Sequence, residues 1–216
     1  MIAVKWAVFL VAVLVSYPAG RWLRDRPALR IQLWTLVGVL PFFPYHDMSL
    51  IFFGGRVGDT HGIEVALVDW LALSLLVASK PAERPLPYRF ALSFYLLIVL
   101  VSIPQARWAL QAEGYAWKLC RMYLLAVAIW WAGSEDDRVP AALLRGMTLG
   151  IVYEGAVVVW QRYGLGLRPA TGSFAHQNTL GMVANLVVMV PVARILAGPT
   201  SFLTKLAPVA AALAAL

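Results

Sequence analysis

The feature that most constrains this chain is a series of long apolar runs that contain no charged residue. Residues 6–20, 31–46, 90–106 and 177–193 contain no Asp, Glu, Lys or Arg. These runs approach the roughly 20 apolar residues that a helix needs to cross a bilayer. They are continuously apolar rather than alternating, which is not the pattern of a transmembrane barrel. The sequence therefore predicts a polytopic membrane protein built from helices.

The composition excludes other classes of protein. Hydrophobic residues make up 61% of the 216 residues and charged residues only 13%, whereas an ordinary soluble domain is about 25% charged. Too few polar residues remain to cover the surface of a soluble domain of this length. A soluble enzyme, a nucleic-acid-binding domain and a disordered chain are thereby excluded. The net charge of +7 is interpreted as topology rather than nucleic-acid affinity, so the expected partner is the lipid bilayer.

The expected fold is an all-α transmembrane helical bundle that forms a single domain over residues 1–216. We expect seven spans and the start of an eighth from residue 203. The seven lie at about 4–19, 31–46, 62–79, 90–105, 116–133, 143–163 and 178–197. Because the chain stops within the apolar run PVAAALAAL, which is too short to cross a bilayer, we expect it to be the N-terminal part of a longer protein.

The basic residues predict an orientation. Loops 20–30, 80–89 and 134–145, together with the chain from residue 194 onward, contain eleven of the 18 Lys and Arg residues. Cytoplasmic loops carry the excess of Lys and Arg in membrane proteins. These loops are therefore predicted to be cytoplasmic, and loop 164–177 is predicted to lie on the outer side.

Metal and cofactor chemistry are not expected. The single cysteine, Cys120, excludes an internal disulfide and a Cys-rich metal site. The three histidines, His46, His61 and His176, do not have the spacing of metal ligands. The sequence therefore predicts no metal and no other cofactor.

Polar side chains inside membrane spans are costly, so each is a functional candidate. Gly146, Gly150, Glu154 and Gln161 share one face of the sixth span at 100° per residue. Two interpretations stay open for this face: helix packing through the GxxxG segment GMTLG, or polar support for a nearby site. Asp69 in the third span is open in the same way, between a structural hydrogen bond and a function.

Loop 164–177 carries the sharpest signal. It is rich in Gly, Ser and Thr and precedes an uncharged helix whose N-cap would be Asn178. Free backbone N–H groups and the helix dipole at such an N-terminus favour an anion. Arg168 and His176 flank the same point, and an Arg can hold a phosphate through two hydrogen bonds. The alternative is a capped helix with an Arg that contacts lipid headgroups.

Two further cations are predicted on the same side. Lys118 and Arg121 begin the fifth span and lie three residues apart, so they share a helix face. Together with Arg168 they would surround a diphosphate at the outer surface. The alternative is that both side chains extend to the membrane interface, as Lys and Arg at span ends commonly do.

These segments resemble a known family. RPATGSFAHQNTLG, residues 168–181, is similar to the Arg-loop segment of the O-antigen ligase and polymerase superfamily. GIEVALVDWLALSLLVA, residues 62–78, resembles an early span of that family with a Glu and an Asp. GAVVVWQRYGLGLRPATG, residues 155–172, resembles the approach to its Arg loop. The resemblance runs from about residue 60 to residue 195, and the loop is its most specific part.

The resemblance implies a bacterial inner-membrane glycosyltransferase. Such proteins take a glycan from an undecaprenyl-diphosphate carrier on the periplasmic side and pass it to lipid A–core, a growing polysaccharide or a protein hydroxyl, with no nucleotide sugar or metal. On this chain the family's diphosphate-loop residues correspond to Arg168, Gly172, His176 and Asn178, and its Gln to Gln161. The family's catalytic base is a His in the C-terminal half. The resemblance therefore implies donor-binding parts here and leaves the catalytic residues unknown.

Two other functions remain as alternatives. A transporter or flippase would use Asp69 and Glu154 as proton or ion sites near the midplane. It would also predict inverted repeats, which the sequence does not show. A non-catalytic membrane scaffold would account for the apolar spans but would give the loop from Arg168 to Asn178 no function.

Overall fold

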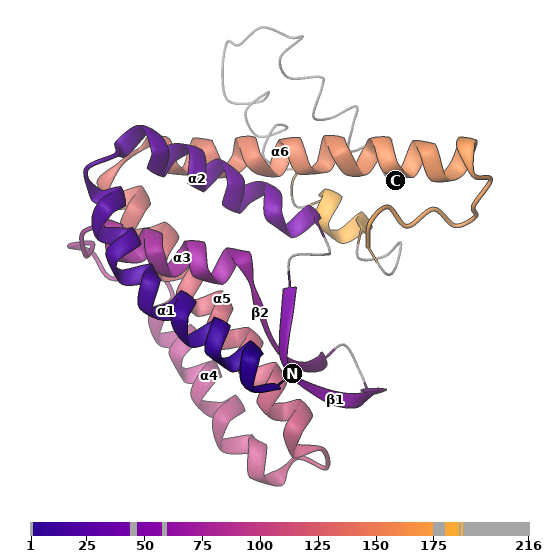
Figure 1. The fold of residues 1–216 in the computed structure, drawn as a ribbon, viewed down its shortest axis with the longest axis horizontal. Helices are drawn as coiled ribbons and strands as arrows, with labels where there is room; N and C mark the ends of the chain where they lie inside the picture. Colours follow the sequence, from indigo (N-terminus) through magenta and orange to yellow (C-terminus); the bar gives the residue numbers. More distant parts are fainter. Residues whose placement is uncertain (1, 44–46, 58–59, 175–179, 186, 188–216) are drawn as a thin grey trace, which may run out of the picture. The chain divides into compact units, whose positions relative to one another are not determined.

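The computed structural model describes residues 2–43, 47–57, 60–174, 180–185 and 187. This part of the chain is mostly helical (Figure 1). It divides into two units, which are described separately. Unit 1 comprises Met1–Ile31 and His46–Val139, and unit 2 comprises Gln32–Tyr45 and Pro140–Leu216.

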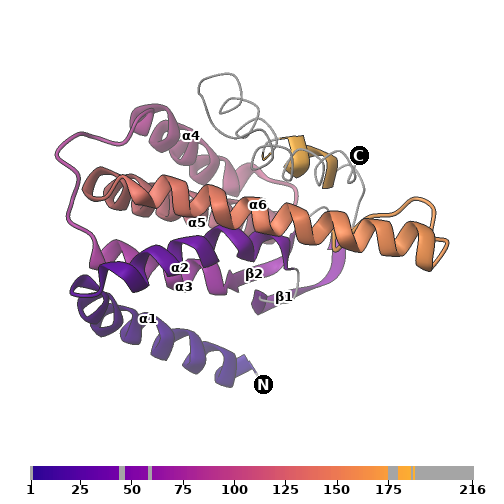
Figure 2. The same ribbon diagram turned by 90° about the horizontal axis from the view of Figure 1, so that it is seen from above.

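Unit 1 is a layer of helices joined to a short hairpin. Helix α1 packs against α3, α3 against α5, and α5 against α4 (Figures 1 and 2). A 3-10 turn, η2, extends α4 before the chain enters α5. These elements overlap the apolar runs of the sequence, although their bounds differ from the predicted ones by several residues. Their bounds are Ile2–Arg24 for α1, Leu67–Ala78 for α3, Arg89–Ser102 for α4, Ile103–Gln105 for η2 and Ala109–Glu135 for α5.

An antiparallel hairpin corrects the all-helical prediction. Strand β1 (Asp47–Val57) pairs with β2 (Thr60–Ala66), with Asp47 opposite Ala66 and an irregular register farther along. The third span was predicted to begin at residue 62, but residues 62–66 belong to β2. Hydropathy does not distinguish a strand from a helix at residues 62–66, because a short apolar run is compatible with either.

Asp69 fixes the start of α3. Its Oδ2 accepts a hydrogen bond of 2.7 Å from the backbone N–H of Ala66, the residue before the helix. A carboxylate that satisfies a free N–H in the first turn stabilises a helix N-terminus. The Trp117 Nε1–H of α5 donates to the Glu64 carbonyl at 2.7 Å and so holds β2 against α5. The junction between β2 and α3 at Ala66 is therefore held on the strand side by Trp117 and on the helix side by Asp69.

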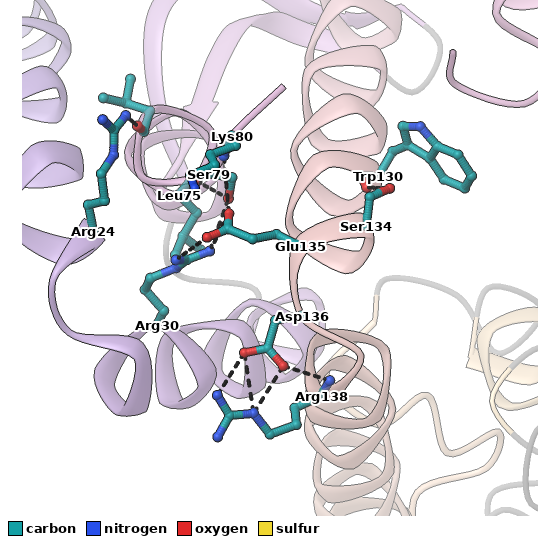
Figure 3. Close-up of polar contacts among 11 residues, drawn as sticks. Arg24, Arg30, Leu75, Ser79, Lys80, Trp130, Ser134, Glu135, Asp136 and Arg138 are labelled. Atoms are coloured by element: carbon teal, nitrogen blue, oxygen red, sulfur yellow. Dashed lines mark hydrogen bonds and ion pairs between the residues drawn. The ribbon is translucent and has the colours of Figure 1, made fainter. Parts of the chain in front are cut away.

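A polar cluster of Arg30, Ser79, Lys80 and Glu135 connects three chain segments at one end of unit 1 (Figure 3). Arg30 donates to both carboxylate oxygens of Glu135, at 3.1 and 3.0 Å, although only 6% of Arg30 is exposed. The Lys80 backbone N–H donates to the same carboxylate at 3.1 Å, and Arg30 Nη2 lies 3.5 Å from Ser79 Oγ. The cluster joins the start of α2 to the ends of α3 and α5. It brings together three loops that the basic residues assign to one side of the membrane.

Unit 2 is centred on α6 (Arg138–Val159), which the π-helical turn η3 (Trp160–Gly164) extends. The later part of α2 (Pro27–Val39) and the 3-10 turn η1 (Leu40–Phe42) pack against α6. After η3 the chain turns back, and residues 180–185 are helical (Figures 1 and 2). The apolar cores of this unit contain Phe42, Ile151, Val158, Leu180, Ala184 and Val187.

The glycines of the sixth span serve close helix packing. A Cβ added to Gly146 would lie 2.0 Å from the Thr35 carbonyl oxygen, and one added to Gly150 would lie 2.0 Å from the Phe42 ring. Gly38 of α2 meets α6 equally closely, because its Cβ would lie 2.3 Å from the Leu143 carbonyl oxygen. The GMTLG segment therefore brings α2 and η1 against α6, as small residues do in membrane helix pairs.

The observed helices differ in length from the predicted spans. Within the described residues, two helical stretches are long and apolar enough to cross a membrane, Val4–Arg24 and Arg138–Gly164. The apolar stretches Pro27–Phe42, Leu67–Ala78 and Arg89–Gln105 are shorter. At 1.5 Å per residue, the 12 residues of α3 span about 18 Å, less than a bilayer core. Most of the predicted span 178–197 and all of the chain from residue 203 lie outside the described residues.

Candidate functional site

The loop that follows α6 is held by two polar side chains of that helix. Gln161, in the turn η3, donates from Nε2 to the Gly172 carbonyl at 2.7 Å. Its Oε1 accepts from the backbone N–H groups of Thr171 and Gly172, at 3.0 and 2.9 Å. One amide side chain therefore satisfies three backbone groups, which a charged side chain of the same length could not do.

Glu154 holds the next residue of the loop. Its side chain is fully buried at 0% exposure, and its Oε2 accepts from the Ser173 backbone N–H at 2.8 Å. Ser173 Oγ is within hydrogen-bonding distance of Glu154 Oε1, and it lies 3.0 Å from the Phe42 carbonyl oxygen. Glu154 is in α6 and Phe42 is in η1, so Ser173 links the loop to both elements.

Position 172, which lies between these contacts, requires a glycine. Its φ is +64°, in the left-handed region that L side chains rarely adopt. A Cβ at this position would also lie 2.2 Å from Glu154 Oε2. The backbone conformation and the close approach of the buried carboxylate both require glycine, which accounts for the Gly in the segment RPATGSF.

Arg168 is on the exposed part of the same loop. It is exposed, and within the described part of the chain no hydrogen bond or ion pair holds its guanidinium. The anchored residues 171–173 begin three positions after it. The arrangement presents a bidentate donor at the end of a fixed loop, which is suited to a phosphate or carboxylate group.

Two residues predicted for the same site lie outside the described residues. They are His176 and Asn178, and with them the predicted N-cap of the seventh span. The helical segment begins in the described part at Leu180, which is buried against Val158. Their role in binding an anion therefore stays a prediction.

The two cations predicted to begin a fifth span lie on α5, in unit 1. Arg121 Nε lies 2.7 Å from Asp69 Oδ2, and the two side chains are 16% and 13% exposed. The contact is an ion pair and not a well-directed hydrogen bond through Nε. Lys118 lies one turn earlier on α5 and is half-buried. Arg168 belongs to unit 2, so the predicted grouping of the three cations stays a prediction.

The Asp69–Arg121 pair gives Asp69 a structural part. Asp69 has both the Ala66 N–H and the Arg121 guanidinium as partners. These two contacts tie the start of α3 to α5. Within the described residues, no group of three His, Cys, Asp or Glu side chains is placed to hold a metal ion.

Sequence reasoning did not single out Ser173 or the Arg30–Glu135 pair. Ser173 follows the predicted Gly172 directly, so a hydroxyl beside a conformationally special glycine was the available signal. Arg30 and Glu135 are 105 residues apart in the chain, and no local pattern links them.

Comparisons with known proteins identified no matching family model, no matching curated protein and no matching solved structure. The similarity of residues 168–181 to O-antigen ligases therefore rests on the residues themselves. It enters below as a proposal.

Proposed function

We propose that this chain is the donor-binding part of a membrane glycosyltransferase of the O-antigen ligase and polymerase kind. Its ligand would be an undecaprenyl-diphosphate-linked glycan, and its acceptor lipid A–core or a growing polysaccharide. The observation that carries the proposal is the loop of residues 168–173. Glu154 and Gln161 hold its backbone, while the guanidinium of Arg168 is exposed and unpaired within the described residues.

The chemistry of the reaction explains why such a loop would matter. Transfer displaces undecaprenyl diphosphate from the anomeric carbon, so negative charge develops on the leaving group. Preorganised donors stabilise developing charge because they need no reorganisation when the reaction occurs. The contacts of Glu154 and Gln161 fix the backbone close to Arg168, and in this proposal the bound diphosphate itself orders the guanidinium. The acceptor hydroxyl would be deprotonated by a base elsewhere.

The exposed apolar surfaces support a place in a lipid membrane, and we propose that this is the bacterial inner membrane. Helix α4 has no buried residue, and Phe90, Leu97 and Val101 on it are all exposed. Helix α1 exposes Val4 and Leu14 in the same way. Contiguous apolar surface of this kind is uncommon on a soluble monomer and is ordinary where lipid covers it.

The proposed topology is a seven-span bundle with the loop at Arg168 on the periplasmic side. Its support is the polar cluster of Arg30, Ser79 and Glu135, which joins three loops predicted to be cytoplasmic. A reporter enzyme fused at Gly166 tests the orientation. Activity restricted to reporters that work in the cytoplasm would contradict it.

A binding experiment tests the proposed ligand. The chain is placed in lipid nanodiscs, and the binding of undecaprenyl diphosphate is compared with that of undecaprenyl monophosphate. We expect the diphosphate to bind more tightly and Arg168→Ala to weaken it by roughly tenfold or more, the loss of a charge-assisted pair. Arg162→Ala is the matched control, since Arg162 is also exposed and lies six residues earlier. Equal effects of the two variants would contradict a specific role for Arg168.

A further inference from the structure

Arg26 is stacked on an exposed tryptophan where α1 ends. Its Cζ lies 3.7 Å from the centroid of the Trp22 ring, and its Nη1 donates to the Trp22 carbonyl at 3.2 Å. Trp22 is 53% exposed, and Arg26 is exposed as well. A guanidinium over the face of an indole ring is attracted by the negative charge of that face. The two side chains therefore place one aromatic ring and one cation together on the surface of unit 1.

Two more arginines lie on the last turn of α1. Arg21 and Arg24 are both exposed, and Arg24 Nη2 donates to the Val77 carbonyl of α3 at 2.9 Å. The segment 21–26 contains these three arginines and one acidic residue, Asp25. Several guanidinium groups beside an exposed indole are suited to phosphate oxygens at a membrane interface, because Arg binds phosphate through two hydrogen bonds and Trp is enriched at that depth. The basic end of α1 is formed by Arg21, Trp22, Arg24 and Arg26.

An exposed apolar stripe runs along α1 to the same point. Four residues lie within about 40° of one another around the helix at 100° per residue: Val4, Val11, Val15 and Trp22. Their side chains are all exposed, at 65%, 58%, 54% and 53%. From Val11 to Trp22 the stripe is about 16 Å long, which matches one leaflet of a hydrocarbon core that is about 30 Å thick. An apolar surface of the length of an acyl chain therefore ends at the stacked Arg26.

We propose that the basic end of α1 binds the headgroup of an anionic phospholipid whose acyl chain lies along this stripe. Two observations together identify the occupant: the arginines complement the charge of a phosphate, and a continuous apolar surface leads away from them. A soluble phosphate or an acidic protein accounts for the arginines but not for the apolar stripe. This lipid site rests on the proposed membrane location, and it involves neither Arg168 nor the glycan carrier.

Native mass spectrometry of the purified chain measures lipid binding directly. The chain in detergent is titrated with phosphatidylglycerol and, separately, with phosphatidylcholine of the same acyl chains, and the affinity for the first bound lipid is determined. We expect phosphatidylglycerol to bind about tenfold more tightly, because only its headgroup carries a net negative charge toward the arginines. Equal affinities would overturn the lipid site. Displacement of phosphatidylglycerol by inorganic phosphate at constant ionic strength would also overturn it, because a soluble anion would then be the occupant.

Substitutions of Arg26 locate the site on α1. Arg26→Ala is expected to weaken phosphatidylglycerol binding by about tenfold, through loss of a charge-assisted pair. Arg26→Lys should recover part of the affinity, since Lys supplies a charge without the planar fork. Arg107→Ala is the matched control, because Arg107 is also exposed and its Cζ lies 5.7 Å from the Trp108 ring, away from α1. Equal losses in Arg26→Ala and Arg107→Ala would contradict a site at the end of α1.

A neutral substitution tests the apolar stripe. Val15→Gln interrupts the stripe without changing a charge, and we expect it to weaken phosphatidylglycerol binding by about threefold. Leu97→Gln is the matched control, because Leu97 is 55% exposed on α4, and equal effects of the two variants would overturn the acyl-chain position. Arg168→Ala should leave phosphatidylglycerol binding unchanged. If undecaprenyl diphosphate does not bind and phosphatidylglycerol does, the proposed glycan carrier is wrong and the lipid site on α1 stands.

Discussion

Two hydrogen-bonded glutamates, Glu135 near the surface and Glu154 fully buried, serve different purposes in the two units. Glu135 in unit 1 is paired with Arg30 by two hydrogen bonds and with the Lys80 N–H by a third. Glu154 in unit 2 has a serine and a backbone N–H as its partners. The first is an ion pair between distant chain segments, and the second is a set of hydrogen bonds to one loop. Glu135 holds helices together through its ion pair, whereas Glu154 determines the conformation of a loop.

The difference has a physical reason. An ion pair is strong where both charges are held in good geometry, and removing one partner leaves the other charge stranded. Such a pair suits a junction that must not move. Hydrogen bonds to backbone groups define a local conformation instead, and they leave the exposed Arg168 of that loop available to a ligand. The predictions below test whether the two devices are independent in this way.

The largest effect on glycan transfer is expected for substitutions of Arg168, measured in the full-length protein. If Arg168 stabilises the departing diphosphate, Arg168→Ala should lower glycan transfer by roughly 30- to 1,000-fold, the effect of removing one preorganised donor. Arg168→Lys should recover part of the rate, because Lys supplies a charge without the bidentate fork. The measurement is transfer rate at equal membrane abundance. Activity of the Ala variant within a few-fold of the unsubstituted protein would contradict the proposed role of Arg168 in binding the diphosphate.

The loop conformation is tested by a pair of glycines. Gly172 and Gly166 both have positive φ values, +64° and +68°, but only a Cβ at Gly172 would meet a neighbour, Glu154. Gly166→Ala should therefore cost about 1 kcal/mol of stability for the left-handed backbone alone. Gly172→Ala should cost about 3 kcal/mol, because it also displaces the carboxylate from Ser173. Thermal unfolding in detergent measures both, and equal losses would mean that Glu154 does not shape the loop.

Much of the helical part of this fold follows from the sequence. The apolar runs locate α1, α4 and α6 to within about five residues, because a helix that is apolar on every side requires a continuous apolar run. The 100° periodicity also places Glu154 and Gln161 on one face, and both contact the loop. The partners of Glu154 and Gln161 could not be predicted in the same way. They are backbone groups of the loop that turns back toward α6, and helical periodicity does not predict the path of a loop.

The hairpin and the ion pairs were not predictable from local patterns. Residues 62–66 were included in a predicted span, and only their pairing with residues 47–52 distinguishes β2 from a helix. Asp69 in the first turn of α3 was a usable signal for the helix start. Arg30 and Glu135 contact each other although they are 105 residues apart in the chain, and no local pattern contains a contact of this range.

Breaking the ion pair should weaken unit 1 without altering the loop. Arg30→Ala leaves Glu135 partly buried without its cation, and we expect it to cost about 2 kcal/mol of stability. Arg138→Ala is the matched control, since Arg138 is 66% exposed in its pair with Asp136 and exposed pairs contribute little. Thermal unfolding measures stability, and binding of undecaprenyl diphosphate should be unchanged in both variants. A binding defect in Arg30→Ala would show that the two devices are coupled.

The smallest effect is a dependence on pH that belongs to unit 1. The Arg30 guanidinium holds the pKa of Glu135 below its ordinary value of 4.5, and the Lys80 N–H acts in the same direction. A carboxyl whose pKa is lower in the folded state than in the unfolded state contributes stability above the unfolded pKa. That contribution is lost as the pH falls through the folded pKa. The stability difference between the unsubstituted chain and Glu135→Gln should therefore be constant near neutral pH and shrink below about pH 4.5. Glu83→Gln, which changes an exposed glutamate, should show no such trend, and a constant difference for Glu135→Gln down to acid pH would mean that the ion pair does not lower this pKa.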